Sequence, residues 1–109
     1  MRTIKTKELK GAALDWAVAK CEGYSEWDGE YFVKDTDGYS GMYFIADYST
    51  DWAQGGPIIE REGIALLPTW TAERPGFSAD GPTPLIAAMR CYVASKLGDE
   101  ITLPEELQP

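Results

Sequence analysis

The chain has 109 residues, an apolar fraction of 44%, two cysteines, no histidine and a formal net charge of −8 at pH 7. This length predicts one domain, residues 1–109, with an acidic C-terminal tail at 98–109. The sequence has no apolar run of about 18 residues and no apolar segment behind its N-terminal charges, so we expect neither a membrane span nor a secretion signal, and a cytoplasmic location.

The charge is unevenly distributed along the chain. Residues 1–20 carry a net charge of +3, residues 21–60 carry −8, and residues 61–109 carry −3. Such acidity repels a phosphate backbone at long range and argues against general nucleic-acid binding. The acidic stretch suits a solvated surface, a basic protein partner or DNA mimicry, and the sequence leaves these alternatives open.

The first half of the chain predicts a strand, a helix and a hairpin. "RTIKT" (2–6) alternates as a strand does. After it, apolar residues at three- and four-residue spacing predict a helix that ends at Gly23. That spacing is carried by Leu14, Ala17, Val18 and Cys21. "YSEWDGE" (24–30) is typical of a polar turn, and "EYFVK" (30–34) with "MYFIADY" (42–48) predicts a β-hairpin.

The second half predicts a corner, short strands and a second helix. Residues 49–57 form the corner, strands are expected at 64–67 and 69–73, and "RPGFSADGP" (74–82) is expected to be a loop. In the second helix, Thr83 is the N-cap, Pro84 the first helical residue and Gly98 the stop. The apolar stripe of this helix consists of Ile86, Met89, Val93 and Leu97. In the tail after it, Ile101 and Leu103 remain able to pack.

This order, β-α-β-β-β-α, predicts an α+β fold. We expect a small antiparallel sheet of three to five strands with two helices packed on one of its faces. A thin two-layer domain leaves a sheet face or edge to cover, and a homodimer is one way to cover it.

The least ordinary stretch is "STDWAQGGPIIERE" (49–62). If 57–62 is the first turn of a helix, the amides of Ile58 and Ile59 have no partner in the helix and form an anion seat. An indole for stacking, glycines for close approach and a guanidinium for an anionic group suit a nucleotide-like small molecule. The candidate ligand-binding residues are Tyr48, Ser49, Thr50, Asp51, Trp52, Gln54, Gly55, Gly56, Arg61 and Thr83.

The same residues also suit a purely structural turn. Asp51 would then cap a short helix, Trp52 would join the core, and Arg61 would pair with Asp51, Glu60 or Glu62 at the surface. Thr83 would only cap the second helix. The sequence leaves both interpretations open.

The residue types of this chain give little support for a catalytic site. Without histidine, the Ser-His and Cys-His pairs and the commonest metal ligand are missing. Glu60 and Glu62 are spaced poorly for an acid–base pair, and the acids at 22–37 lack the spacing of a calcium-binding loop. Cys21 and Cys91 fall in expected helices and suit small core positions. We therefore expect no catalytic residue, no metal site, no cofactor and no enzymatic activity.

Three segments carry a family resemblance: "LDWAVAKCEG" (14–23), "STDWAQGGPIIEREGI" (49–64) and "GPTPLIAAMRCYVASKLGDEITLPEEL" (81–107). They resemble the NinX-type proteins of lambdoid phages and their prophage relatives in enterobacteria, over most of the chain. The resemblance implies an accessory protein that acts inside the infected or lysogenic bacterium. Such proteins often inhibit host factors or counter defence, and the resemblance assigns no catalytic residue.

Two hypotheses about function follow. In the first, the corner at 48–61 binds a small nucleotide-like anion and sequesters a host or defence signal. In the second, the acidic surface at 21–60 is a protein-interaction module that inhibits a basic host protein.

Overall fold

The computed structural model describes residues 2–27, 30–33, 43–44, 47–68 and 70–103. Its helices are η1 (Thr6–Glu8, 3₁₀), α1 (Gly11–Cys21), α2 (Trp52–Glu62) and α3 (Pro84–Leu97). Its strands are β1 (Arg2–Lys5), β2 (Tyr24–Trp27), β3 (Glu30–Val33), β4 (Tyr43–Phe44), β5 (Ala65–Leu66), β6 (Thr71–Arg74), β7 (Phe77–Asp80) and β8 (Glu100–Leu103).

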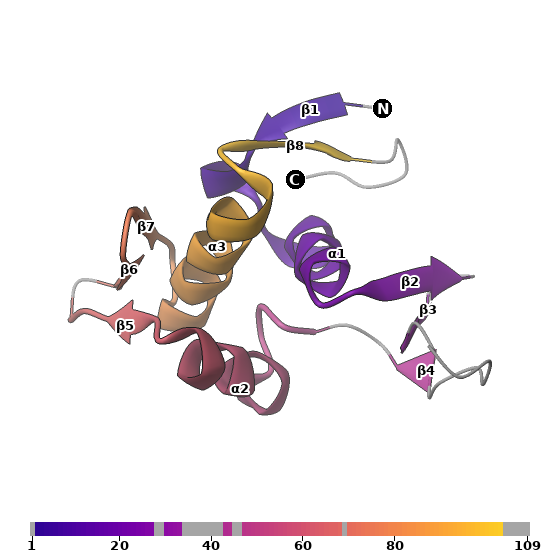
Figure 1. Cartoon of the computed structure of the whole chain (residues 1–109), viewed down its shortest axis with the longest axis horizontal. Coiled ribbons are helices and arrows are strands. Elements are labelled where there is room, and N and C mark those ends of the chain that lie inside the picture. Colours follow the sequence, from indigo (N-terminus) through magenta and orange to yellow (C-terminus); the bar gives the residue numbers. More distant parts are fainter. Residues whose placement is uncertain (1, 28–29, 34–42, 45–46, 69, 104–109) are drawn as a thin grey trace.

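The helix α3 lies at the centre of the fold, with the other elements around it (Figure 1). The Thr83 hydroxyl oxygen caps it by accepting a hydrogen bond of 3.1 Å from the Ile86 amide, and Pro84 follows in the first turn. Because α3 contacts α1, α2 and the strands β5 to β7, it is buried on several sides. Its buried residues are Leu85, Ala87, Ala88, Met89, Cys91, Tyr92 and Val93. The helix predicted here, with its cap, is confirmed.

The helix α1 packs against α3 through the apolar face that its spacing predicts. Leu14, Ala17 and Val18 on this face are fully buried. Gly23 follows the end of the helix with φ 85°, a left-handed conformation that glycine adopts without steric cost. The predicted helix and its glycine stop are confirmed, although the helix begins only at Gly11 because η1 precedes it.

The strands β1 and β8 pair antiparallel and join the two ends of the described chain. Ile4 pairs with Ile101, and both are buried with Leu103. The Thr6 amide donates to the Asp99 carbonyl oxygen at 2.7 Å, and the Thr6 hydroxyl donates to the Gly98 carbonyl oxygen at 2.6 Å. The first strand is confirmed, and the expected tail packs as far as Leu103. Residues 104–109 lie outside the described residues.

The remaining described strands form two further antiparallel sheets, in the orders β2-β3-β4 and β5-β6-β7. The pairing of β3 with β4 confirms the predicted hairpin, and β5 and β6 match the two short strands expected around Pro68. Two expectations are wrong. The segment expected to be a polar turn contains β2, and the segment expected to be a loop contains β7. Each of these strands pairs antiparallel with a strand near it in the chain, and this pairing overrides a polar composition.

The fold is α+β, as the sequence predicts, but its arrangement differs from one sheet covered by two helices. Among the described residues the strands divide into three sheets, and α2 adds a third α-helix. Each described strand has only two to four residues. Within the described ranges, no helix is long and apolar enough to cross a membrane.

Candidate functional site

The candidate ligand residues belong to α2 and to the turn before it. Asp51 caps the helix, because its Oδ1 accepts a hydrogen bond of 2.9 Å from the Ala53 amide. The Asp51 carbonyl oxygen accepts from the amides of Gln54 and Gly55 at 3.0 and 2.9 Å. Asp51 itself therefore holds these three amides at the start of the helix. The interpretation in which Asp51 caps a helix is confirmed.

The prediction that a helix begins at Pro57 is wrong. Pro57 lies inside α2, so the amides of Ile58 and Ile59 are in the body of the helix and not at its positive end. The proline is tolerated because Gly56, which precedes it, has no Cβ to clash with the ring. One hydrogen bond to the Ala53 carbonyl oxygen is lost. The anion seat expected from these amides has no geometric basis.

Gly55 and Gly56 have different surroundings. A Cβ added to Gly55 would lie 2.6 Å from Leu85 Cδ1 and 2.7 Å from the Tyr48 carbonyl oxygen. At Gly56 nothing lies within 4 Å of such an atom. The close approach that Gly55 permits is therefore to the protein's own chain, at the crossing of α2 and α3.

Tyr48 and Ser49 are buried. Tyr48 belongs to the hydrophobic core. The Ser49 amide donates a hydrogen bond of 2.7 Å to Asp15 Oδ1 in α1. Burial raises the pKa of Asp15, and the hydrogen bond from Ser49 opposes this rise. This contact attaches the turn before α2 to α1, and it places two of the candidate residues away from solvent.

The other candidate residues are divided between structural contacts and the surface. Gln54 Oε1 accepts a hydrogen bond of 2.7 Å from the Asp47 amide, and the Thr83 hydroxyl caps α3. Thr50 is exposed. The side chain of Trp52 is also exposed, to 52%, so the interpretation that placed it in the core is wrong.

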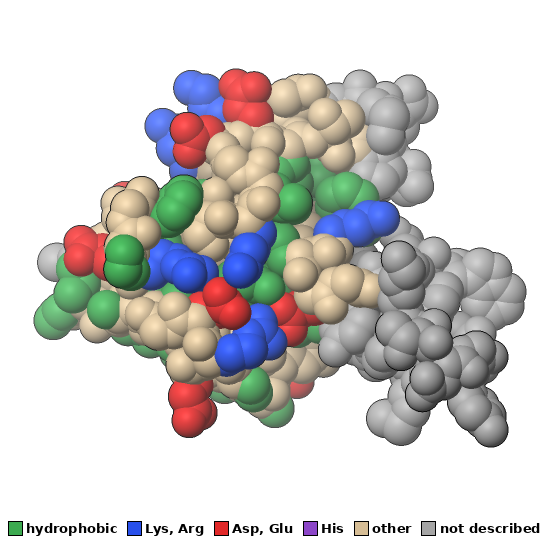
Figure 2. All heavy atoms as spheres, in the orientation of Figure 1, with side chains coloured by type: hydrophobic (Ala, Val, Ile, Leu, Met, Phe, Trp, Pro, Cys, Tyr) green, Lys and Arg blue, Asp and Glu red, His purple; other side chains and the backbone are tan. Residues whose placement is uncertain are grey.

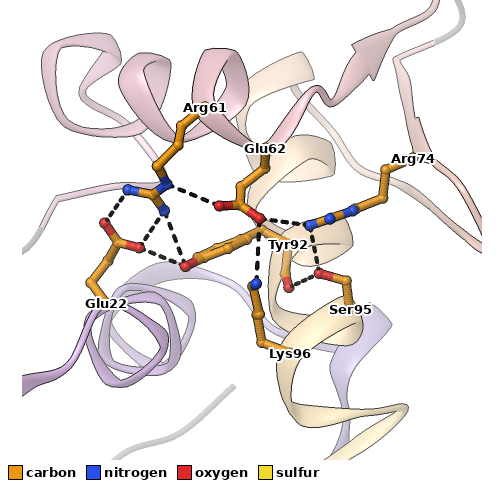
Figure 3. Close-up of polar contacts among 7 residues, drawn as sticks. All are labelled: Glu22, Arg61, Glu62, Arg74, Tyr92, Ser95 and Lys96. Carbon is orange, nitrogen blue, oxygen red and sulfur yellow. Dashed lines mark hydrogen bonds and ion pairs between the residues drawn. The ribbon is translucent and has the colours of Figure 1, made fainter.

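Arg61 lies at the far end of α2 from Trp52, roughly 14 Å away along the helix axis. Its Nη1 and Nη2 donate to the two carboxylate oxygens of Glu22 at 3.0 and 2.6 Å, and its Nε donates to Glu62 Oε2 at 2.9 Å (Figure 3). These contacts, first with Glu22 and then with Glu62, raise the pKa of Arg61 further. The pairing with Glu62 confirms one of the expected surface pairs. Arg61 and Trp52 do not meet at a common site.

A cluster of charged and polar side chains surrounds Arg61 (Figure 3). We call this set the Arg61 cluster; its members are Glu22, Arg61, Glu62, Arg74, Tyr92, Ser95 and Lys96. Glu62 accepts from Arg74 Nη1 at 2.9 Å and pairs with Lys96 Nζ at 3.4 Å. The hydrogen bond from Arg61, with these further contacts, lowers the pKa of Glu62 to about 2. Burial and the contact with Glu22 raise the pKa of Tyr92, whose hydroxyl donates to Glu22 Oε2 at 2.5 Å.

The Arg61 cluster connects the end of α1 with α2, β6 and α3. Figure 2 shows basic and acidic side chains lying next to one another in the middle of the side of the molecule that faces the viewer. Because its carboxylates and cations are paired with one another, the cluster stabilises the packing and offers little uncompensated charge to a ligand. The contact of Arg61 with Glu22 and Tyr92 is not predictable from the sequence, since these partners are distant along the chain and no local pattern marks them.

One face of α2 is turned to solvent. Five residues at helical spacing make up this α2 outer face: Trp52, Ala53, Gly56, Pro57 and Glu60. Asp47, which is exposed, and Asp51, which is partly exposed, precede it in the chain. The residues around the indole have small side chains, and the charged residues on this face or directly before it, Asp47, Asp51 and Glu60, are all acidic.

The cysteines and carboxylates of the described chain offer no metal centre. No group of three or more such side chains is placed to hold an ion in the described ranges. Cys91 is fully buried, and burial raises the pKa of Cys21 to about 12, with Glu22 adding to the shift. Both thiols therefore suit packing, as their helical positions predict.

These observations define a small α+β protein with an aromatic and acidic exposed helix face. Residues 5–96 match the protein family described as Bacteriophage P22, NinX. The match covers most of the 109 residues, so the chain belongs to this family of bacteriophage proteins and the resemblance drawn from the sequence is confirmed. No curated protein matches the chain.

Proposed function

We propose that this NinX protein is a non-enzymatic accessory protein that binds a basic surface of a host protein through the α2 outer face. It would act in the cytoplasm of the infected or lysogenic bacterium and inhibit the protein it covers. The observation that carries the proposal is the exposure of Trp52, which is 52% accessible on the outer side of a helix whose opposite side is buried at Gly55 and Ile58. Tryptophan is usually largely buried, and exposed indoles are enriched at the centres of protein interfaces.

The residues around the indole favour close contact with a partner. Gly56 lies one helical turn from Trp52, and Ala53 and Pro57 flank the pair. None of these side chains is long or flexible, so little conformational entropy is lost when a partner covers them. The α2 outer face is therefore a preorganised apolar platform with a large anchor on it.

The charge of the α2 outer face indicates which kind of protein surface it binds. Glu60 lies on the α2 outer face, and Asp47 and Asp51 come just before it, whereas the charge of neighbouring Arg61 is offset by Glu22 and Glu62. Acidic side chains around an apolar centre suit a surface rich in lysine or arginine, and they speed the encounter with it. The proposed surface is the 47–60 part of the acidic interaction surface that the sequence predicts at 21–60.

The nucleotide-like ligand expected at 48–61 receives less support from the geometry. Tyr48 and Ser49 are buried, the amides after Asp51 are bound to Asp51, and Gly55 packs on Leu85. Of the groups assigned to stacking, close approach and anion binding, Trp52 and Gly56 remain accessible, whereas Gly55 packs on Leu85 and Arg61 is paired with Glu22 and Glu62. No cation–π contact with Trp52 occurs among the described residues, and an indole without such a contact favours a protein partner over a nucleotide.

The test is affinity capture from a bacterial host lysate, with Trp52→Ala compared with Trp70→Ala. The two indoles are almost equally exposed, at 52% and 51%, but Trp70 lies between β5 and β6. We expect the wild-type protein and Trp70→Ala to capture the same host protein, and Trp52→Ala to lose it. Loss of an interface tryptophan costs about 2 kcal/mol or more, which is roughly thirtyfold in affinity.

A second experiment tests whether the acidic residues at the α2 outer face contribute to binding. Asp47→Asn combined with Glu60→Gln removes two carboxylates without removing a described side-chain hydrogen bond or ion pair, and it should weaken capture most at low salt. Equal capture by the wild type and Trp52→Ala would contradict the proposal. If neither added salt nor the Asp47→Asn and Glu60→Gln variant changes the amount of host protein captured, the proposal that the partner is basic is contradicted.

A further inference from the structure

The structure contains a cleft lined by Lys5, Lys7 and Arg90, on a different part of the surface from the α2 outer face. It lies between α3, β7, the β1–η1 segment and the start of β8, elements that are neighbours in Figure 1. Its volume is about 440 Å³, and a second hollow of about 290 Å³ continues from it, since both are lined by Lys7 and Arg90. The volume of the larger hollow is in the range of small-molecule sites.

Arg90 is the central cation of this cleft. Its Nε donates to the Leu9 carbonyl oxygen at 2.7 Å, and its Nη1 donates to the Asp80 carbonyl oxygen at 2.9 Å. Main-chain oxygens thus fix the guanidinium, and its Nη2 makes no hydrogen bond to a described residue. Unlike Arg61 and Arg74, Arg90 forms no ion pair with any described carboxylate.

Arg90 is therefore not neutralised by an ion pair with a described carboxylate, although Asp80, which lines the second hollow, attracts it over a longer distance. Arg90 is partly buried, and burial lowers its pKa, although an arginine remains charged at neutral pH. A partly desolvated cation held rigidly by carbonyl oxygens interacts more strongly with an anion than a mobile surface cation does. Lys5 and Lys7 line the same cleft and bring two exposed ammonium groups to it.

The other lining groups narrow the ligand class. Ser78 in β7, and Asp99 and Glu100 at the start of β8, are also among the residues that line the cleft. Carboxylates accept hydrogen bonds from ligand hydroxyls but repel further anionic groups. No aromatic side chain is among the described lining residues, so the site offers no platform on which a base could stack.

We propose that this cleft binds a small phosphate monoester that carries hydroxyl groups, of the sugar-phosphate class. Arg90 and Lys7 hold the phosphate group, with Lys5 at the side, and Asp99 and Glu100 accept hydrogen bonds from the hydroxyls. Thr6 holds the η1 side of the cleft in place through its hydrogen bond to Gly98. The site is independent of Trp52 and of the protein partner proposed above.

The experiment is isothermal titration calorimetry at low salt with ribose 5-phosphate, ribose and inorganic phosphate. We expect saturable binding of ribose 5-phosphate and at least about tenfold weaker binding of the other two, since each lacks one of the recognised groups. Lys7→Gln should weaken binding of ribose 5-phosphate about tenfold. Lys7 is exposed and has no described side-chain bond, so its loss should leave the fold intact.

Lys10→Gln is the matched control, because it removes the same charge from the same segment outside the cleft. It should bind within about twofold of the wild type, since an exposed charge outside the site contributes little, and Trp52→Ala should bind like the wild type. No saturable binding of ribose 5-phosphate, or equal losses in Lys7→Gln and Lys10→Gln, would overturn the proposal. Inorganic phosphate that binds as tightly as ribose 5-phosphate would overturn the role of the hydroxyls.

Discussion

Gly55 in α2 packs so closely against Leu85 in α3 that a Cβ at Gly55 would lie 2.6 Å from Leu85 Cδ1. The Tyr48 carbonyl oxygen, which cannot move as freely as a side chain, would lie 2.7 Å from the same atom. We expect Gly55→Ala to lower the free energy of unfolding by about 1–3 kcal/mol, because α2 must shift away from α3. Urea denaturation followed by circular dichroism measures this change.

Gly56→Ala is the matched substitution on the exposed side of the same helix. Nothing lies within 4 Å of the added Cβ, and alanine favours the helix over glycine by about 1 kcal/mol. The new Cβ precedes Pro57, which reduces this gain. We expect Gly56→Ala to change stability by less than about 1 kcal/mol. If the two variants lose the same stability, the close contact with Leu85 is not what requires Gly55.

The comparison of α3 with α2 shows which helices the sequence can predict. Thr83, Pro84 and Gly98 are local signals that act within one turn of the helix ends, and they place α3 correctly. In α2 the same logic fails, because Pro57 suggests a helix start but lies inside the helix. The decisive features are the cap at Asp51 and the contact of Gly55 with α3, and the second of these depends on packing that no local pattern reveals.

At the candidate site, too, the sequence predicts local contacts but not contacts between distant parts of the chain. The sequence correctly indicates that Asp51 can cap and that Arg61 can pair with Glu62. It does not reveal that Arg61 also binds Glu22, because that contact requires the end of α1 to lie beside the end of α2. Composition along the chain shows an excess of positive charge in residues 1–20, but only the fold brings Lys5 and Lys7 to Arg90.

Asp15 tests whether a buried carboxylate costs stability. Its pKa is raised in the folded protein, so folding favours the protonated form, and the penalty is absent at low pH and grows as pH rises through the folded pKa. Asp15→Asn retains an acceptor for the Ser49 amide without the charge. We expect it to be at least as stable as the wild type at pH 7, and to lose any advantage below about pH 4.

Asp15→Ala is the contrasting variant, because it leaves the buried Ser49 amide without its acceptor. We expect it to lose about 1–3 kcal/mol at pH 7. Chemical denaturation at several pH values measures both variants. If Asp15→Asn is as unstable as Asp15→Ala at pH 7, the carboxylate charge stabilises the fold and burial is not the dominant effect.

Cys21 should resist alkylation in the folded protein. Burial, with a smaller contribution from Glu22, raises its pKa to about 12, so only a very small fraction is thiolate at neutral pH. Cys91 is fully buried. We expect iodoacetamide at pH 8 to modify both thiols slowly in the native protein and at ordinary rates in urea, as measured by mass spectrometry. Rapid modification of Cys21 in native buffer would contradict its burial.

Glu62 makes the Arg61 cluster sensitive to acid. Its pKa falls from 4.5 to about 2 on folding, so its contribution to stability is complete above about pH 4.5 and is lost as pH falls toward 2. Glu62→Gln should therefore be less stable than the wild type at pH 7, by about 2 kcal/mol, and the difference should shrink between pH 4.5 and 2. Glu60→Gln, an exposed neighbour without a described ion pair, should show no such trend. Urea midpoints across this pH range measure the difference, and a gap between the wild type and Glu62→Gln that stays constant down to pH 2 would show that the ion pairs of Glu62 do not stabilise the fold.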